Sequence, residues 1–228
     1  SPAPWSFLHG YFLTFAVSFM VSWMTVDLGG FDSRYYAGLM LVVVAVKGPA
    51  LADVAQRIGP LLGPQTLVLP AMNGVPWWFA QSTPVLAGEP LRSVDPEGRI
   101  GTLIPLEQVV GCVVHASSSV AAPGVIHHKF GNTVILGELS GQLSPRLAAL
   151  SELFVQAGFD SPVSTQIQRD IWFKLWGNMT MNPVSAITGV TADLVLDDAL
   201  VRNFCSAVML EAKEIGARLG IDISQEPE

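Results

Sequence analysis

Leu41-Val42-Val43-Val44-Ala45-Val46 is an unbroken apolar run, rich in β-branched residues, and it ends at Lys47-Gly48-Pro49. Such a run is typical of a strand that is buried on both faces. Apolar side chains at helical spacing follow over residues 50–62, and a second apolar run covers residues 66–71. Strand, helix and strand within about thirty residues predict a βαβ crossover of a parallel sheet. Ligands of such sheets bind beyond the carboxyl ends of the strands, where Lys47 and Asn73-Gly74 are expected to lie.

A second stretch, residues 171–183, places a single lysine in an otherwise apolar helix. Lys174, Asn178 and Asn182 are four residues apart, so they form one polar stripe on one helical face. We expect neighbouring tryptophans to surround the ammonium, because desolvation would then make it a ready proton donor. The alternative is that Lys174 extends to solvent and the asparagines merely cap the helix end. The stripe by itself favours neither interpretation.

The middle of the chain completes an α/β part. Strands are predicted at residues 109–114, 125–128, 132–137 and 163–165, with an amphipathic helix over residues 144–157. Residues 84–101 are rich in Pro, Gly and Ser, and we expect them to form a surface excursion at the end of the sheet. The aromatic triplet Trp77-Trp78-Phe79 is expected to pack beneath that loop.

A helical part follows, with its boundary near Gln166. The pattern from there to Gly220 predicts helices, and Asp197-Asp198 is expected to open the last of them. We therefore expect three segments. Residues 1–36 are an atypical apolar segment, residues 37–165 a Rossmann-like α/β domain, and residues 166–228 an all-α domain.

Three blocks in this order resemble the ketopantoate reductase (2-dehydropantoate 2-reductase) family. They are Val44-Ala45-Val46-Lys47, Asn73-Gly74, and residues 170–178 together with Asn182-Pro183 and residues 185–188. The resemblance covers roughly residues 39 to 220. It implies a nucleotide-binding α/β domain followed by a helical domain, with the active site in the cleft between them. It also implies reduction of ketopantoate to pantoate with NADPH, in pantothenate and coenzyme A synthesis.

The resemblance implies a role for each matching residue. Lys174 looks like the proton donor to the substrate carbonyl, and Asn178 and Asn182 look like amides that bind the substrate. Asn73 resembles an asparagine that touches both nicotinamide ribose and substrate. Lys47 resembles a basic residue near the adenosine phosphate of the cofactor. A strand ending near Ser117 makes this serine a weaker cofactor candidate, and His115 in the same strand is expected to be a packed histidine.

Residues 1–36 depart from the family. A strand followed by a Gly-x-Gly-x-x-Gly turn is expected there, and Gly29-Gly30 has neither the spacing nor the helix that should follow. No charged residue occurs from Ser1 to Val26. We favour a foreign or misread start to a truncated coding sequence. A membrane anchor is the second interpretation, and a divergent first strand is the third.

The other end also departs from the family, which places a further serine and a catalytic glutamate well beyond the lysine stripe. We therefore expect weak NADPH binding, little or no reductase activity, and association through the apolar surface of the final helix. Ala192 stands where relatives often have another asparagine. Three functions remain as alternatives to an NADPH-dependent ketopantoate reductase: a non-catalytic remnant of such an enzyme, another NAD(P)-dependent 2-oxoacid reductase, and, more weakly, a membrane-tethered sensor.

Composition narrows the class of partner. The net charge is −7 and no run of Lys or Arg occurs, which argues against nucleic acid. Cys112 and Cys205 lie far apart in apolar surroundings, as expected for buried free thiols in a reducing compartment, the cytoplasm. The adjacent pair His127-His128 has no nearby cysteine or carboxylate array, so no metal site is predicted. We expect a small-molecule 2-oxoacid as substrate, no membrane partner, and a homodimer.

Overall fold

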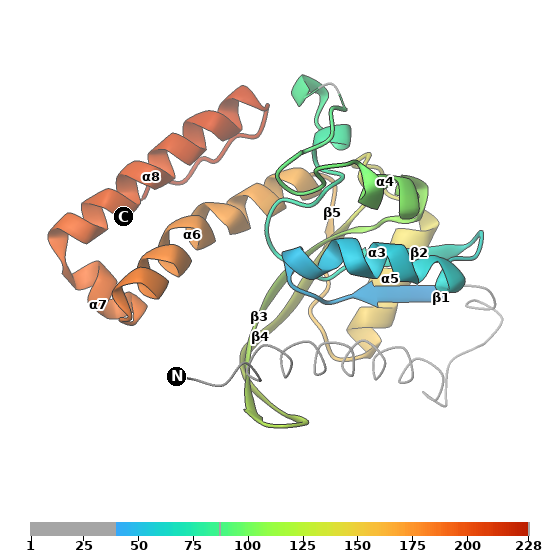
Figure 1. Cartoon of the computed structure of the whole chain (residues 1–228), viewed down its shortest axis with the longest axis horizontal. Coiled ribbons are helices and arrows are strands. Elements are labelled where there is room, and N and C mark those ends of the chain that lie inside the picture. The colour runs from blue at the N-terminus through green and yellow to red at the C-terminus, as the bar shows by residue number, and fades with distance from the viewer. Residues whose placement is uncertain (1–39, 87, 228) are drawn as a thin grey trace.

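The structure is a computed structural model that describes residues 40–86 and 88–227 (Figure 1). The expectations for residues 1–36 lie outside the described residues. A mixed α/β part is followed by helices that extend to one side of it. Among the helices in the described ranges, none combines the length and the apolar character that a membrane span requires.

The predicted βαβ unit is confirmed. Strand β1 (Met40–Val44) pairs in parallel with β2 (Thr66–Pro70), with Met40 opposite Thr66 and Val44 opposite Pro70. Between them lie the short 3₁₀ turns η1 (Gly48–Ala50) and η2 (Gly59–Leu61), which flank helix α3 (Leu51–Ile58). The single helix expected over residues 50–62 is therefore shorter. Each 3₁₀ turn begins with a Gly-Pro pair, and proline has no backbone N–H to donate to a continuing helix.

The segment after β2 lies mostly at the surface over residues 84–86 and 88–99, as expected, and it joins the core from Ile100 onward. It contains η3 (Ala80–Ser82), η4 (Pro84–Leu86), α4 (Arg99–Leu103) and η5 (Leu106–Gln108). Ile100 and Ile104 are fully buried, in one cluster with α3. The packing role of the aromatic triplet is confirmed, because Trp77, Trp78 and Phe79 are at most 2% exposed.

A long hairpin forms the middle of the sheet. Strand β3 (Gly111–Ala122) pairs antiparallel with β4 (Val125–Gly137), whose carboxyl end pairs in parallel with β5 (Val163–Ser164). A parallel bridge between Val68 and Val109 joins this group to β2. The hairpin tip extends away from the sheet (Figure 1). The two strands expected at residues 125–128 and 132–137 are one, because cross-strand pairing continues to the tip.

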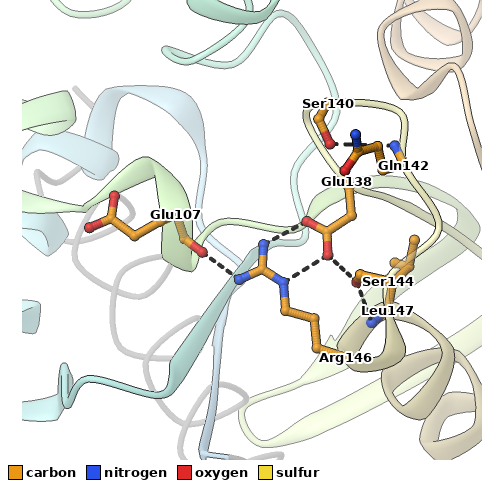
Figure 2. A network of polar contacts seen from close by, with 7 residues as sticks. All are labelled: Glu107, Glu138, Ser140, Gln142, Ser144, Arg146 and Leu147. Carbon is orange, nitrogen blue, oxygen red and sulfur yellow. Dashed lines mark hydrogen bonds and ion pairs between the residues drawn. The ribbon is translucent and has the colours of Figure 1, made fainter.

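Helix α5 (Pro145–Gln156) begins at a network of polar contacts shown in Figure 2. Ser144 accepts a hydrogen bond from the N–H of Leu147 at 3.1 Å and thereby caps the helix. The Ser144 hydroxyl also donates to Glu138, and Arg146 binds both oxygens of that carboxylate at 2.7 and 2.6 Å. Arg146 additionally donates to the carbonyl of Glu107, so the network connects the end of β4, the start of α5 and η5.

The helical part is confirmed from Ile167 onward. It consists of α6 (Ile167–Thr188), α7 (Ala192–Asp197) and α8 (Ala199–Arg218). Asp198 caps α8, as its position predicted, by accepting from the N–H groups of Leu200 and Val201. After α8 the chain runs back along that helix (Figure 1). Both cysteines are buried free thiols, and burial raises the pKa of Cys112 to about 12.

Candidate functional site

Helix α6 begins directly against the sheet. Ideal Cβ atoms built on Gly111 and Gly137 would each lie 2.7 Å from the side chain of Ile167, closer than real Cβ contacts. The two glycines thus allow the first turn of α6 to approach the backbones of β3 and β4. Asp170 accepts a hydrogen bond from Ser164 of β5, and Gln168 donates to the carbonyl of Leu139 at 2.8 Å. These contacts fix the direction in which the helix leaves the sheet.

The polar stripe continues the face of α6 that touches the sheet. Ile167 and Ile171 are buried in the core and lie seven and three residues before Lys174, so the three share a helical face. Lys174 and Asn178 are half-buried and Asn182 is exposed. The stripe therefore begins where α6 passes the edge of the sheet, on the side that faces the α/β part.

The expected cage of tryptophans around Lys174 is wrong. Trp172 and Trp176 donate their indole N–H groups to the carbonyls of Ala212 and Met209, at 3.2 and 2.6 Å. Both tryptophans therefore face α8. Residues two apart point to nearly opposite sides of a helix, because each residue turns the chain by about 100°. The tryptophans hold α6 against α8, and the opposite face presents the ammonium.

His115 is a residue of β3 whose pKa is affected by the charge of Lys174. Side chains alternate along a strand, so His115 shares a face with Gly111 and Val113, which pack against the start of α6. His115 is half-buried. Burial lowers its pKa, the charge of Lys174 lowers it further, and the charge of Asp170 raises it. The charge of Lys174 thus acts on a histidine that the sequence analysis expected only to be packed. Its even spacing from Gly111 was the sequence signal that it lies on the α6 side of β3.

Asn73 connects the end of β2 to the same strand. Its side-chain amide donates to the carbonyl of Val114 at 3.0 Å and accepts from the N–H of Val114 at 3.1 Å. This two-point contact holds the turn after β2 beside β3, next to His115. Gly74 follows with φ of +108°, a conformation that favours glycine, and an added Cβ there would meet nothing within 4 Å.

A cleft of about 520 Å³ lies at the carboxyl ends of β1 and β2. It is lined by Asn73, Gly74, Gly48, Trp77 and neighbouring residues. The structure thus places Asn73 at a cleft beyond the strand ends, as strand order predicted. Lys47 is exposed and directly precedes Gly48, but it is not among the lining residues. A second hollow of about 450 Å³ lies by residues 139–141 and 219–222, and none of the predicted site residues lines it.

The prediction that the strand ends near Ser117 is wrong. Strand β3 continues for five more residues, and Ser117 pairs with Phe130 inside the hairpin. The described residues that line the cleft do not include Ser117. The pairing of β3 with β4 shifts register between His115 and Ser117, opposite Gly131. The backbones are close there, because a Cβ added to Gly131 would lie 2.4 Å from the carbonyl oxygen of His115. The hairpin therefore bends at that level without ending.

Together, the βαβ unit with polar groups beyond its strand ends and the helical part after it define a Rossmann-like α/β protein with a helical C-terminal part. Sequence comparison agrees. The family described as ketopantoate reductase PanE/ApbA matches residues 36–141, and its C-terminal counterpart matches residues 166–228. A curated 2-dehydropantoate 2-reductase from Mesorhizobium japonicum is 42% identical over 181 residues, which cover 79% of this chain and 56% of that protein.

Solved structures agree as well. One is a crystal structure from Ralstonia solanacearum of a protein assigned as a ketopantoate reductase. It is 55% identical with a TM-score of 0.80, and the match covers 84% of this chain and 60% of that one. The 2-dehydropantoate 2-reductase of Geobacter metallireducens is 26% identical with a TM-score of 0.64, and the match covers 81% of this chain and 55% of that one. The chain belongs to the ketopantoate reductase family. It spans about half the length of the curated 2-dehydropantoate 2-reductases it matches.

Proposed function

We propose that this protein is an NADPH-dependent reductase that converts 2-dehydropantoate to pantoate, a step toward pantothenate and coenzyme A, with Lys174 as the proton donor. One observation carries the proposal. The half-buried ammonium lies on the face of α6 that continues from the sheet, and Asn73 ties the cleft at the strand ends to the strand beside that face. We assign residues 37–165 to nucleotide binding and residues 166–228 to substrate binding and catalysis.

The cleft fits part of a dinucleotide. Its volume lies within the range of small-molecule sites. Gly48 and Gly74 have open space where a Cβ would be, so a ligand can approach both backbones. The exposed Lys47, directly before the lining residue Gly48, would attract the adenosine phosphate, which favours NADPH over NADH, and Asn73 would face the nicotinamide ribose. Bound NADPH would supply the hydride.

The residues of the chain account for the rest of the reaction. Addition of that hydride to the ketone carbon would leave the electron pair of the C=O bond on the oxygen. Lys174 stabilises this charge and gives a proton to the oxygen, which yields the alcohol; water then reprotonates the amine. Asn178 and Asn182, one and two turns further along α6, would bind the polar groups of the substrate and fix its orientation.

The assay is oxidation of NADPH with ketopantoate. In a protein extended to the length of its relatives, Lys174→Ala should lower turnover by roughly a hundredfold or more, as loss of a general acid does. Lys213→Ala is the matched control, because Lys213 lies on α8, where it binds the carbonyl of Gln225. Asn178→Ala should mainly raise KM. Equal turnover by Lys174→Ala and the Lys213 control would disprove the proton-donor role.

Two further measurements test the sequence-based expectations. Fluorescence titration with NADPH and NADH shows whether the chain binds either cofactor and prefers the phosphorylated one. Turnover of this chain is compared with that of a protein extended to the length of its relatives. Comparable rates from the two would overturn the expectation of weak activity.

A further inference from the structure

His115 and Lys174 are the next residues along β3 and α6 after residues that pack together. Two residues along a strand advance about 6.6 Å, and four residues along a helix advance about 6 Å. Where a strand and a helix run side by side, every second strand residue therefore stays opposite every fourth helix residue for several residues. Gly111 lies against Ile167, and Val113 shares a core cluster with Ile171. The next residue on that face of β3 is His115, and the next turn of α6 carries Lys174.

Two contacts hold His115 in place. Its neighbour Val114 is fixed through both its N–H and its C=O by Asn73. On the other side, β4 contributes Thr133 as the strand partner of His115, and threonine carries no charge. The charged groups that act on the imidazole are Lys174 and Asp170, both on α6. Burial and the nearby ammonium each disfavour the imidazolium, so the ring is a neutral acceptor near neutrality.

An ammonium has three donors and no acceptor. When Lys174 donates one proton to the ketone oxygen, its other two N–H groups need acceptors in a site from which bound ligands exclude water. A neutral imidazole on the facing strand supplies one acceptor. Such a bond belongs to the ligand-bound state, because active-site hydrogen bonds in ligand-free enzymes are often long and shorten around the ligand.

We propose that His115 is a positioning residue for Lys174: its neutral ring accepts a hydrogen bond from the ammonium and aims the remaining N–H at the substrate oxygen. The proposal rests on the reductase function proposed above. His115 itself does not exchange a proton with the substrate.

The first test is independent of turnover. NMR titration of the His115 ring in the full chain, assigned by its loss in His115→Gln, measures the pKa of the imidazole. Lys174→Met should raise this pKa, because the variant removes a nearby positive charge, and Asp170→Asn should lower it. Lys213→Met, on α8, should leave it unchanged. An unchanged pKa in Lys174→Met overturns the proposal whether or not the chain is active.

The second test observes the ammonium directly. A held ammonium exchanges its protons slowly enough to give an NH₃⁺ signal, which we expect for Lys174 in the presence of NADPH and pantoate. His115→Leu should abolish this signal, whereas His115→Gln, which keeps an acceptor, should retain it. Survival of the signal in the leucine variant would show that another group holds Lys174.

Kinetics of a protein extended to the length of its relatives separate positioning from a purely structural role. In His115→Leu, turnover should fall roughly tenfold or more with little change in KM for NADPH, and His115→Gln should restore most of it. Absence of turnover in the extended wild-type protein refutes the proposed function, while the NMR results still decide whether His115 holds Lys174. Wild-type turnover in the extended His115→Leu variant overturns the positioning role.

Discussion

At the scale of single residues, Gly111 and Gly137 decide how closely α6 approaches the sheet. An added Cβ on Gly137 would lie 2.7 Å from the Ile167 side chain and 2.9 Å from the backbone oxygen of Ser164. The backbone oxygen cannot move aside as a flexible side chain can. These glycines therefore set the starting point of the helix that carries the candidate proton donor.

Gly137→Ala should lower the free energy of unfolding by about 1–3 kcal/mol, because overpacking displaces α6 or β5. Gly177→Ala is the contrasting variant. Gly177 lies inside α6 with nothing within 4 Å of an added Cβ, so alanine should raise the free energy of unfolding by roughly 0.5–1 kcal/mol. Urea unfolding of both variants measures the difference. Equal effects of the two substitutions would show that close packing at Gly137 is unimportant.

At the scale of elements, the network at Glu138 joins β4, α5 and η5 (Figure 2). The Glu138 side chain is 7% exposed and that of Arg146 is 35% exposed, so the pair is only partly shielded from solvent. Burial raises the pKa of Glu138. Hydrogen bonds from Arg146 and Ser144 and the charge of Arg146 outweigh burial and hold the pKa below its ordinary value.

A lowered pKa in the folded state gives a definite pH dependence. The contribution of Glu138 to stability is complete above the pKa of an unfolded glutamate, and it is lost as pH falls through the lower, folded pKa. Glu138→Gln should therefore cost about 2 kcal/mol at neutral pH, a figure already reduced for the partial exposure of Arg146. The difference between variant and wild type should shrink in acid. A constant difference from neutral to acidic pH, measured by urea unfolding, would contradict this account.

At the scale of the whole molecule, the helical part presents large apolar side chains to solvent. Ile187 is 85% exposed, Leu200 81% and Phe204 58%, at the end of α6 and the start of α8. Leu210 and Ile215 further along α8 are also exposed, as the sequence predicted, whereas Val208 and Leu219 are half-buried. Exposed apolar surface of this kind favours association.

We therefore expect this chain to self-associate at concentrations where most soluble domains of its size are monomeric. Leu200→Glu combined with Phe204→Glu should weaken association, because two charges would have to be buried at the contact. Ala217→Glu adds a charge at another exposed position of the same helix and is the control. Sedimentation velocity over a range of concentrations measures the effect. Equal association by the double variant and the control would exclude this surface.

Much of the fold could be predicted from the sequence, because its signals are local. Apolar runs and helical spacing determined β1, α3, β2 and α5, and a capping aspartate marked the start of α8. The i, i+4, i+8 spacing determined that Lys174, Asn178 and Asn182 share a face of α6. These patterns depend on residues close in sequence, and the period of a helix or a strand converts them directly into a face.

Only the tertiary structure decided what each face meets. The tryptophans next to Lys174 turn to α8, β3 runs past Ser117 into the hairpin, and residues 84–101 contribute to the core. It also put His115 within reach of the charge of Lys174 and bound Asn73 to Val114 across 41 positions of sequence. Such contacts depend on how far one element approaches another. That distance is set here by two glycines under Ile167, through close packing between segments that are remote in the chain.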